Sequence, residues 1–107
     1  MPPLRISGAT GESASSVNGT YMPTGKAYNG RMLLRQQEDP DMWLRYVTYD
    51  GLNTWIVSTT SSKDANVDVG VCFCVEKNLL HPTEAGTWKV AIGGVLVVQD
   101  TVVVEAI

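Results

Sequence analysis

Hydrophobic and polar residues alternate with a period of two along most of the chain. This alternation is typical of β-strands that bury one face and expose the other. The clearest hairpin is predicted from 42–49, which is rich in Trp, Tyr and Val, to 54–59. The intervening Asp50-Gly51 is a strong signal for a turn that joins two antiparallel strands.

A second hairpin is predicted from 88–92 to 95–98, because the Gly93-Gly94 between them suits a tight turn. Turn-forming residues separate the alternating segments at intervals of roughly 8–12 residues. The remaining apolar stretches predict further short strands at 4–7, 17–22, 31–37 and 102–105.

The segment 67–75 is predicted to be the cleanest half-buried strand. Val and Phe residues occupy every second position, from Val67 to Val75, and Cys72 and Cys74 fall on the opposite face. No window shows a convincing helical period, although 78–81 could hold one helical turn.

Composition agrees with a chain of many strands. Val, Ile and Thr together account for 28 of 107 residues, and these β-branched side chains favour strands. We therefore predict an all-β fold, either an antiparallel β-sandwich or a partly open β-barrel of about eight short strands. No linker separates two parts of the chain, so residues 1–107 are predicted to form a single β domain.

Composition and charge also exclude several classes of protein. The chain is 44% hydrophobic, which excludes a disordered polar tail, and it is too short for a two-domain enzyme. Its net charge of −3 argues against nucleic-acid and anionic-membrane binding. We see no signal peptide, and the longest apolar run, 95–98, cannot span a membrane. Cys72 and Cys74 are predicted to be free thiols, which favours a cytoplasmic location.

The sequence lacks the residues that common enzyme mechanisms need. The single histidine, His81, precedes a proline, and no Gly-x-Ser-x-Gly motif supplies a nucleophile for it. The glycines in 19–27 have the wrong spacing for a phosphate-binding loop. Glu38, Asp39 and Asp41 indicate a solvated acidic turn rather than a pair of catalytic carboxylates. We therefore predict that the protein is not an enzyme.

A metal site is also disfavoured. Cys72, Cys74 and His81 would supply three soft ligands, and Glu76 or Asp68 could supply a fourth. Structural zinc sites contain two closely spaced ligand pairs, whereas this chain has only one. Two small thiols packed under a loop explain the cysteines equally well. We predict neither a metal nor a cofactor.

Arginines and aromatic residues lie close together in the sequence. A strand face with Arg31, Arg35 and Arg45 among aromatic rings could hold single-stranded nucleic acid, as in some β-barrels. Core aromatics covered by the apolar stems of arginines explain the same residues. Because the chain is acidic overall, we favour the second interpretation and predict no nucleic-acid partner.

The segment 42–49 carries large apolar groups on both faces. Leu44 and Tyr46 point one way, while Trp43, Val47 and Tyr49 point the other. Either the strand is buried on both sides, or one face meets a partner. The core interpretation is favoured for at least two of the three tryptophans. The candidate binding site is an aromatic patch that consists of Trp43, Tyr49, Trp55 and Trp88.

Several short motifs occur in a fixed order between about Leu4 and Val90: Val17-Asn-Gly-Thr-Tyr21, Asn29-Gly-Arg31, Trp43-Leu-Arg-Tyr46, Trp55-Ile-Val-Ser58, Pro82 and Trp88-Lys-Val90. This order resembles a small, poorly characterised β-module of protist and algal proteins, with Leu34 where the pattern usually has Tyr. The resemblance implies an interaction or scaffolding module, and it brings neither an enzymatic activity nor a ligand.

These observations predict a non-enzymatic protein-interaction or structural module whose partner is another protein. The alternative is a barrel that binds a small ligand in a pocket lined by Trp43, Trp55 or Trp88, since eight-stranded barrels can hold one small ligand.

Overall fold

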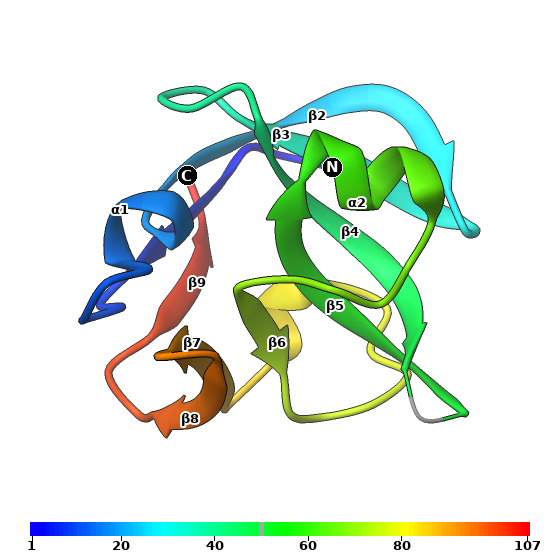
Figure 1. Cartoon of the computed structure of the whole chain (residues 1–107). Coiled ribbons are helices and arrows are strands. Elements are labelled where there is room, and N and C mark those ends of the chain that lie inside the picture. The colour runs from blue at the N-terminus through cyan, green and yellow to red at the C-terminus, as the bar shows by residue number, and fades with distance from the viewer. Residues whose placement is uncertain (50) are drawn as a thin grey trace.

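The structure is a computed structural model that describes residues 1–49 and 51–107, with only the backbone described at Tyr49. The described residues form nine strands, two short helices and one 3-10 turn (Figure 1). The strands are β1 (Leu4–Ser7), β2 (Gly19–Tyr28), β3 (Arg31–Gln36), β4 (Met42–Tyr49), β5 (Leu52–Thr59), β6 (Cys72–Cys74), β7 (Trp88–Ile92), β8 (Val95–Gln99) and β9 (Val103–Ala106). The helices are α1 (Ala14–Val17) and α2 (Thr60–Ala65), and the 3-10 turn is η1 (Pro82–Glu84).

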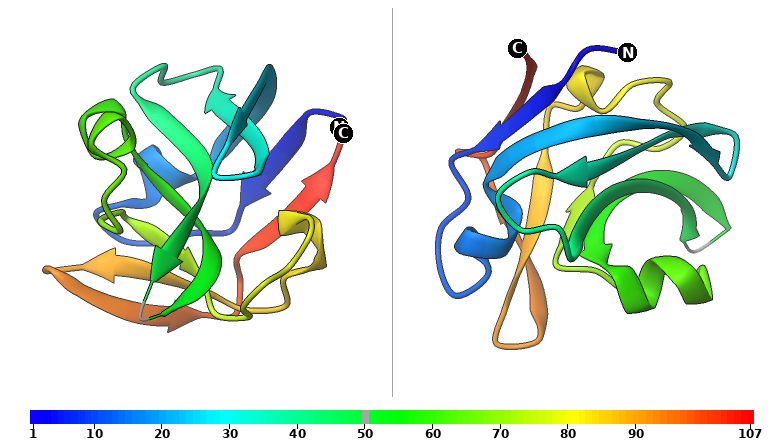
Figure 2. Two further views of the ribbon diagram at one scale, coloured as in Figure 1. Left: turned by 90° about the vertical axis from the view of Figure 1, so that its right-hand side faces the viewer. Right: turned by 90° about the horizontal axis from the view of Figure 1, so that it is seen from above.

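All nine strands belong to one curled antiparallel sheet. Their order is β8-β7-β6-β5-β4-β3-β2-β1-β9. The chain meanders from β1 to β8, and β9 returns to pair with the free side of β1. The two edges of the sheet are therefore β8 and β9, which are consecutive in the sequence (Figure 2). The all-β antiparallel prediction is confirmed, with nine strands rather than about eight.

Both predicted hairpins are present. In the first, β4 and β5 pair from Met42 opposite Thr59 to Tyr49 opposite Leu52. In the second, β7 and β8 flank a turn in which Gly93 and Gly94 both have positive φ angles of 57° and 79°. Two consecutive residues of this conformation form the tight turn that matches strand twist, and glycine adopts it without strain.

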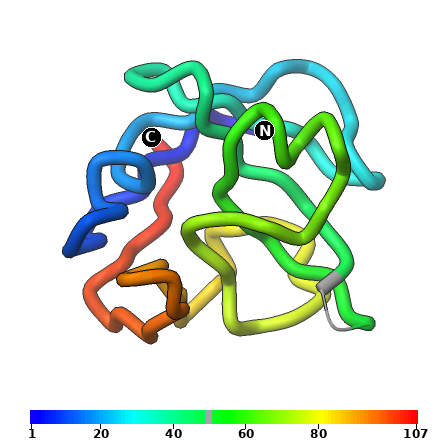
Figure 3. Tube along the Cα trace, viewed as in Figure 1, coloured from blue at the N-terminus to red at the C-terminus, as the bar shows by residue number. Residues whose placement is uncertain are grey.

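The prediction of one strand over 67–75 is wrong. Only Cys72–Cys74 pairs in the sheet, and Val67, Val69 and Val75 are exposed. The chain first forms α2, whose N-terminus is capped by the side chain of Thr59. It then crosses in front of β4 and β5 (Figure 3), where the guanidinium of Arg45 binds the carbonyls of Val67 and Val69. These carbonyls are therefore bound to a side chain rather than to a neighbouring strand.

Boundaries of other elements also differ from the predictions, most of all those of β2 and η1. The strand expected at 17–22 begins at Gly19 and continues to Tyr28, with a shift of register between Pro23 and Ala27. An irregularity of this kind lets a strand pass a proline and bend. The one helical turn considered at 78–81 lies slightly later in the chain, as η1.

The core lies mainly inside the curl of the sheet. Its largest fully buried side chains are those of Trp55, Trp88 and Tyr21. A smaller cluster of Val47, Ile56 and Phe73 is separate from the main core. Members of the main cluster come from most of the strands: Leu4, Ile6, Tyr21, Leu34, Leu44, Tyr46, Trp55, Val57, Cys72, Cys74, Trp88, Val90 and Val104.

A loop between β1 and α1 connects the two ends of the sheet. The backbone of Thr10 makes two hydrogen bonds with the side-chain amide of Gln99, at 2.8 and 2.9 Å. The hydroxyl of Thr101 donates to the carbonyl of Gly8 at 2.6 Å. These bonds attach the end of β1 to the turn between β8 and β9, two strands that do not pair with each other.

Candidate functional site

The three tryptophans of the predicted aromatic patch are buried. Trp55 and Trp88 have no exposed surface and lie in the main core, while Trp43 is 8% exposed. The side chain of Tyr49 lies outside the described residues. Residues 42–47 are all buried, so β4 is covered on both of its faces along this stretch. The core interpretation therefore accounts for the tryptophans.

The ring faces near β4 are covered by the chain's own cations. The guanidinium carbon of Arg35 lies 4.5 Å from the ring centre of Trp43, and Lys63 lies 4.4 Å from the same ring centre. Arg31 stacks over Tyr46 at 5.0 Å. These are contacts of guanidinium and ammonium groups with ring faces, so the arginines Arg31 and Arg35 pack on aromatic residues of the same chain.

Arg45 departs from that interpretation because it is fully buried. Its guanidinium donates to the hydroxyl of Ser58 at 2.6 Å, to the hydroxyl of Tyr28 at 3.2 Å, and to the carbonyls of Val67 and Val69. All of these partners are neutral groups of the protein. The side chain thus fixes the segment after α2 to the sheet and is not displayed to a ligand.

The two cysteines are free and buried. Burial raises the pKa of Cys72 to about 12, and burial together with nearby Glu76 raises the pKa of Cys74 to about 12. Because the thiolate is the nucleophile and the metal ligand, burial and a raised pKa disfavour both reactions at these thiols. The described residues contain no group of three His, Cys, Asp or Glu side chains placed to hold a metal.

We expect neither thiol to react with iodoacetamide at neutral pH while the protein is folded, because both are buried and protonated. In denaturant, mass spectrometry should detect alkylation of Cys72 and Cys74. A Ser61→Cys variant places a third thiol on the exposed surface of α2 and should react at once in the folded protein. Rapid native labelling of Cys72 would contradict the burial described here.

The acidic turn and the histidine have structural roles. The carboxylate of Glu38 accepts a hydrogen bond from the Thr20 N–H at 2.8 Å, and that of Asp41 accepts one from the Thr60 N–H at 3.2 Å. The N–H of His81 donates to the carboxylate of Glu84 at the start of η1. These carboxylates are engaged by backbone groups, and none is held opposite another across a cleft.

Glu76 closes the long loop between β6 and β7. Its carboxylate accepts hydrogen bonds from the N–H groups of Gly86 and Thr87, both at 3.2 Å. Burial alone would raise the pKa of Glu76, but hydrogen bonds from its own N–H and from those of Thr87 and Gly86 outweigh that effect and lower it. The pKa of Glu38 is also lowered, chiefly by the hydrogen bond from Thr20.

Because the pKa values of Glu38 and Glu76 are lowered in the folded protein, we expect the protein to lose stability in acid. A carboxyl group whose pKa is lower in the folded than in the unfolded protein stabilises the fold above its unfolded pKa of about 4.3. That contribution disappears as the pH falls through the folded pKa. We expect the urea midpoint to fall steadily below about pH 4.5 and to fall less in Glu76→Gln, which carries no titratable carboxyl. An identical pH dependence in the variant would contradict the role of Glu76.

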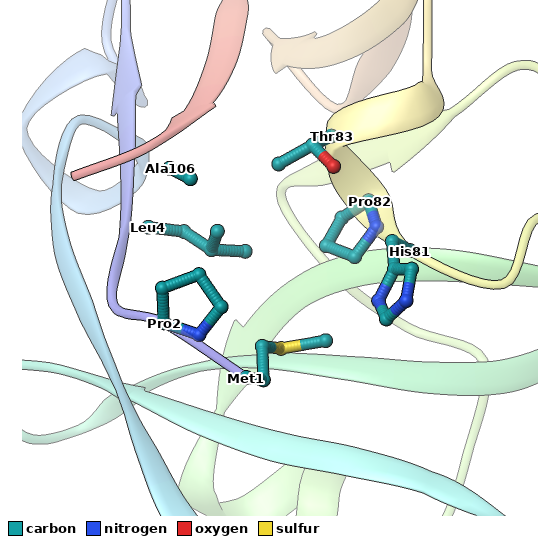
Figure 4. A pocket seen from close by; sticks show the side chains of 7 residues that line it. All are labelled: Met1, Pro2, Leu4, His81, Pro82, Thr83 and Ala106. Atoms are coloured by element: carbon teal, nitrogen blue, oxygen red, sulfur yellow. The ribbon is translucent and has the colours of Figure 1, made fainter.

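A small hollow lies beside the N-terminal residues and η1 (Figure 4). Its volume is about 150 Å³, and no tryptophan lines it. The lining residues are Met1, Pro2, Leu4, His81, Pro82, Thr83 and Ala106. The surface is mostly apolar, with one imidazole at its border, so it offers few groups that could recognise a ligand.

The most unusual surface is strand β8. Val95, Val97 and Val98 of this strand are 62, 41 and 49% exposed, and Ile92, at the end of the neighbouring β7, is 38% exposed. The β7–β8 hairpin projects from the body of the molecule, and β8 forms its border (Figure 2). Edge strands of monomeric proteins are usually protected by charges, prolines or covering segments. The sequence of β8, Val-Leu-Val-Val-Gln, contains neither a charge nor a proline.

The free edge of β8 also presents backbone hydrogen-bonding groups. In a two-residue hairpin the pair beside the turn, here Ile92 and Val95, is hydrogen-bonded, and the pairs alternate from there. The N–H and C=O groups of Leu96 and Val98 therefore point away from β7. The hydrogen bond of Ala91, which lies opposite Leu96, agrees with this alternation. The Ala91 N–H donates to the carbonyl of Val71, on the side of β7 that faces away from β8, at 2.8 Å.

Sequence analysis did not identify this edge as a site. The available signal was the run 95–98, where four consecutive apolar residues interrupt the alternation after a tight turn. Such a run places apolar side chains on both faces of one strand. The sheet order was needed to show that this strand lies at an edge rather than between two neighbours.

No known protein family, curated protein or solved structure matches this chain. Among the described residues, no helix is long and apolar enough to cross a membrane.

Proposed function

We propose that this chain is a non-enzymatic protein-interaction module of the cytoplasm and that its contact surface is the free edge of β8. The observation that carries the proposal is an uncharged edge strand with exposed Val95, Val97 and Val98 on a projecting hairpin. Such an edge is a template for pairing with another chain. We further propose, on the ordered motifs between Val17 and Val90, that the chain is related to the small β-modules of protist and algal proteins.

We also infer that the curled sheet is a partly open barrel rather than a sandwich. A sandwich needs two sheets packed face to face, whereas all nine strands here belong to one sheet. The loop after β1 binds Gln99 and Thr101, so it attaches the end of β1 to the turn between β8 and β9, the two edges of the sheet. In this arrangement the interior is filled by side chains such as Trp55 and Trp88.

The alternative of a small-ligand barrel has little support. A ligand pocket would have to be lined by tryptophans, but Trp55 and Trp88 are packed in the core. The hollow beside η1 is lined by other residues and is small. The exposed strand β8 is therefore a better candidate for a binding surface than the interior of the barrel, which is filled by side chains.

Site-specific photo-cross-linking tests the proposal. A photoreactive benzophenone amino acid replaces Val98 on β8 in one version of the protein and exposed Lys26 on β2 in the other. After irradiation in a cell extract, we expect discrete adducts from position 98, identified by mass spectrometry and reproduced with the purified partner. The Lys26 position should give none of them.

The same adducts from both positions would indicate non-specific collision and contradict the proposal. Absence of adducts at position 98 in every extract tried would also contradict it. Because both substituted side chains are exposed, neither substitution disturbs the core.

A further inference from the structure

We propose that the free edge of β8 pairs with an extended peptide segment that has β-branched residues in its middle and lysine or arginine at its ends. This inference rests on the proposed function and names the chemistry of the partner. It is carried by the backbone groups that the edge presents, by the apolar side chains around them and by the charges at the two ends of the strand.

The backbone of β8 supplies the directional part of the contact. The outward N–H and C=O groups of Leu96 and Val98 can form the ladder of a further strand. The side chains beside them are apolar on both faces of the sheet, with Val95 and Val97 on one face and Leu96 and Val98 on the other. A partner strand with apolar or β-branched residues would cover both sets.

Charge supplies the selectivity. The carboxylate of Glu12 accepts a hydrogen bond from the N–H of Gly93, so it lies at the turn that precedes β8. Asp100 is exposed and directly follows β8. The uncharged strand therefore has a carboxylate near each end. Lys89, the only charged residue within the hairpin, lies on β7, one strand back from the edge. A segment with a cation at each end matches this arrangement.

The same charges disfavour pairing with a second copy of the chain. In antiparallel pairing of two β8 strands about Val97, Asp100 of each copy lies opposite Gly94 of the other. The Glu12 carboxylate lies beside that turn. At each end of such a dimer interface, the Asp100 carboxylate of one copy would approach the Glu12 carboxylate of the other. Like charges in these positions are destabilising.

Short synthetic peptides test the proposal on the whole chain. One peptide has lysine at each end and alternating threonine and valine between them, and a matched peptide has glutamate at each end. We expect the lysine peptide to bind at least about tenfold more tightly, because two attractions are replaced by two repulsions. Fluorescence anisotropy measures affinity, and NMR should show the Leu96 and Val98 amide signals shifting on binding.

Two variants separate strand pairing from simple charge attraction. Val98→Pro removes one outward N–H without removing a bond to β7, which is the position that an edge strand tolerates. We expect this variant to bind the lysine peptide at least about tenfold more weakly. Val98→Thr retains the N–H and the β-branched shape and should bind as the original protein does. Equal binding by Val98→Pro, with unchanged circular dichroism, would overturn the proposal.

Asp100→Lys tests the charge argument independently and keeps the proposal falsifiable if Val98→Pro fails to fold. This variant should bind the lysine peptide more weakly than the original protein does. It should also increase self-association in analytical ultracentrifugation, because the introduced ammonium group would face the Glu12 carboxylate of a second copy. Wild-type protein that already dimerises with protected Leu96 and Val98 amides would overturn the choice of partner.

The two proposals fail in distinguishable ways. Suppose that cross-linking at Val98 succeeds while neither peptide binds, or while the glutamate peptide binds as well as the lysine peptide. In either case the inference about the partner is wrong, but the proposal of an interaction module is not contradicted. If no adduct forms at Val98 and no peptide shifts the Leu96 and Val98 amides, both proposals are wrong.

Discussion

Replacing Arg45 by Met should destabilise the protein by about 3 kcal/mol. The guanidinium is fully buried and donates hydrogen bonds to Ser58, Tyr28 and the carbonyls of Val67 and Val69. Methionine fills much of the same space but donates nothing, so these acceptors lose a charged partner. The carbonyls of Val67 and Val69 can then be satisfied by water only if the segment that contains them moves away from β4 and β5.

Urea denaturation measures the loss of stability in Arg45→Met, and hydrogen exchange shows which part of the chain becomes less protected. The N–H of Val71 donates to Val57 at 2.8 Å at the end of the same segment, so its exchange should accelerate in Arg45→Met. Arg35→Met is the matched control, because Arg35 is exposed and stacks on Trp43. It should cost at most about 1 kcal/mol. Equal losses in the two variants would contradict the role of Arg45.

Arg45→Lys distinguishes geometry from charge. A lysine keeps the positive charge, but its single ammonium cannot reach acceptors on both sides as a planar guanidinium does. We expect a loss between those of Arg35→Met and Arg45→Met. Full stability in Arg45→Lys would mean that charge alone matters at this position.

The same residue explains where sequence analysis failed. The segment 67–75 alternates as a strand does, and nothing nearby in the sequence breaks the pattern. Its first half leaves the sheet because a buried arginine from β4 binds its carbonyls. A contact of this kind joins residues more than twenty positions apart, so periodicity within a short window cannot reveal it.

Local signals were sufficient where the turn and the two strands lie together in the sequence. The β4–β5 and β7–β8 hairpins follow from alternation and from glycine-containing turns, and both are present. The burial of Trp55 and Trp88 also follows from the small size of the domain. The candidate site could not be predicted in this way, because whether β8 is an edge depends on how β9 leaves it to pair with β1.

Gly8→Ala should destabilise the protein by about 3–5 kcal/mol, the largest single effect that we expect. Gly8 has a φ angle of +85°, and a Cβ atom there would lie 1.9 Å from the carbonyl oxygen of Thr101. Because that oxygen belongs to the backbone, the loop or the β8–β9 turn must move. The hydrogen bond from Thr101 to the Gly8 carbonyl would then be disturbed.

Gly25→Ala is the matched control for the clash. Gly25 has a similar φ angle of +79°, but a Cβ atom there would meet nothing within 4 Å. It should therefore show only the backbone strain, about 1–2 kcal/mol. The difference between the two variants in urea denaturation isolates the close approach of the loop to the β8–β9 turn. If they lose equal stability, the loop does not hold the two ends of the sheet together as tightly as the contact between Gly8 and Thr101 implies.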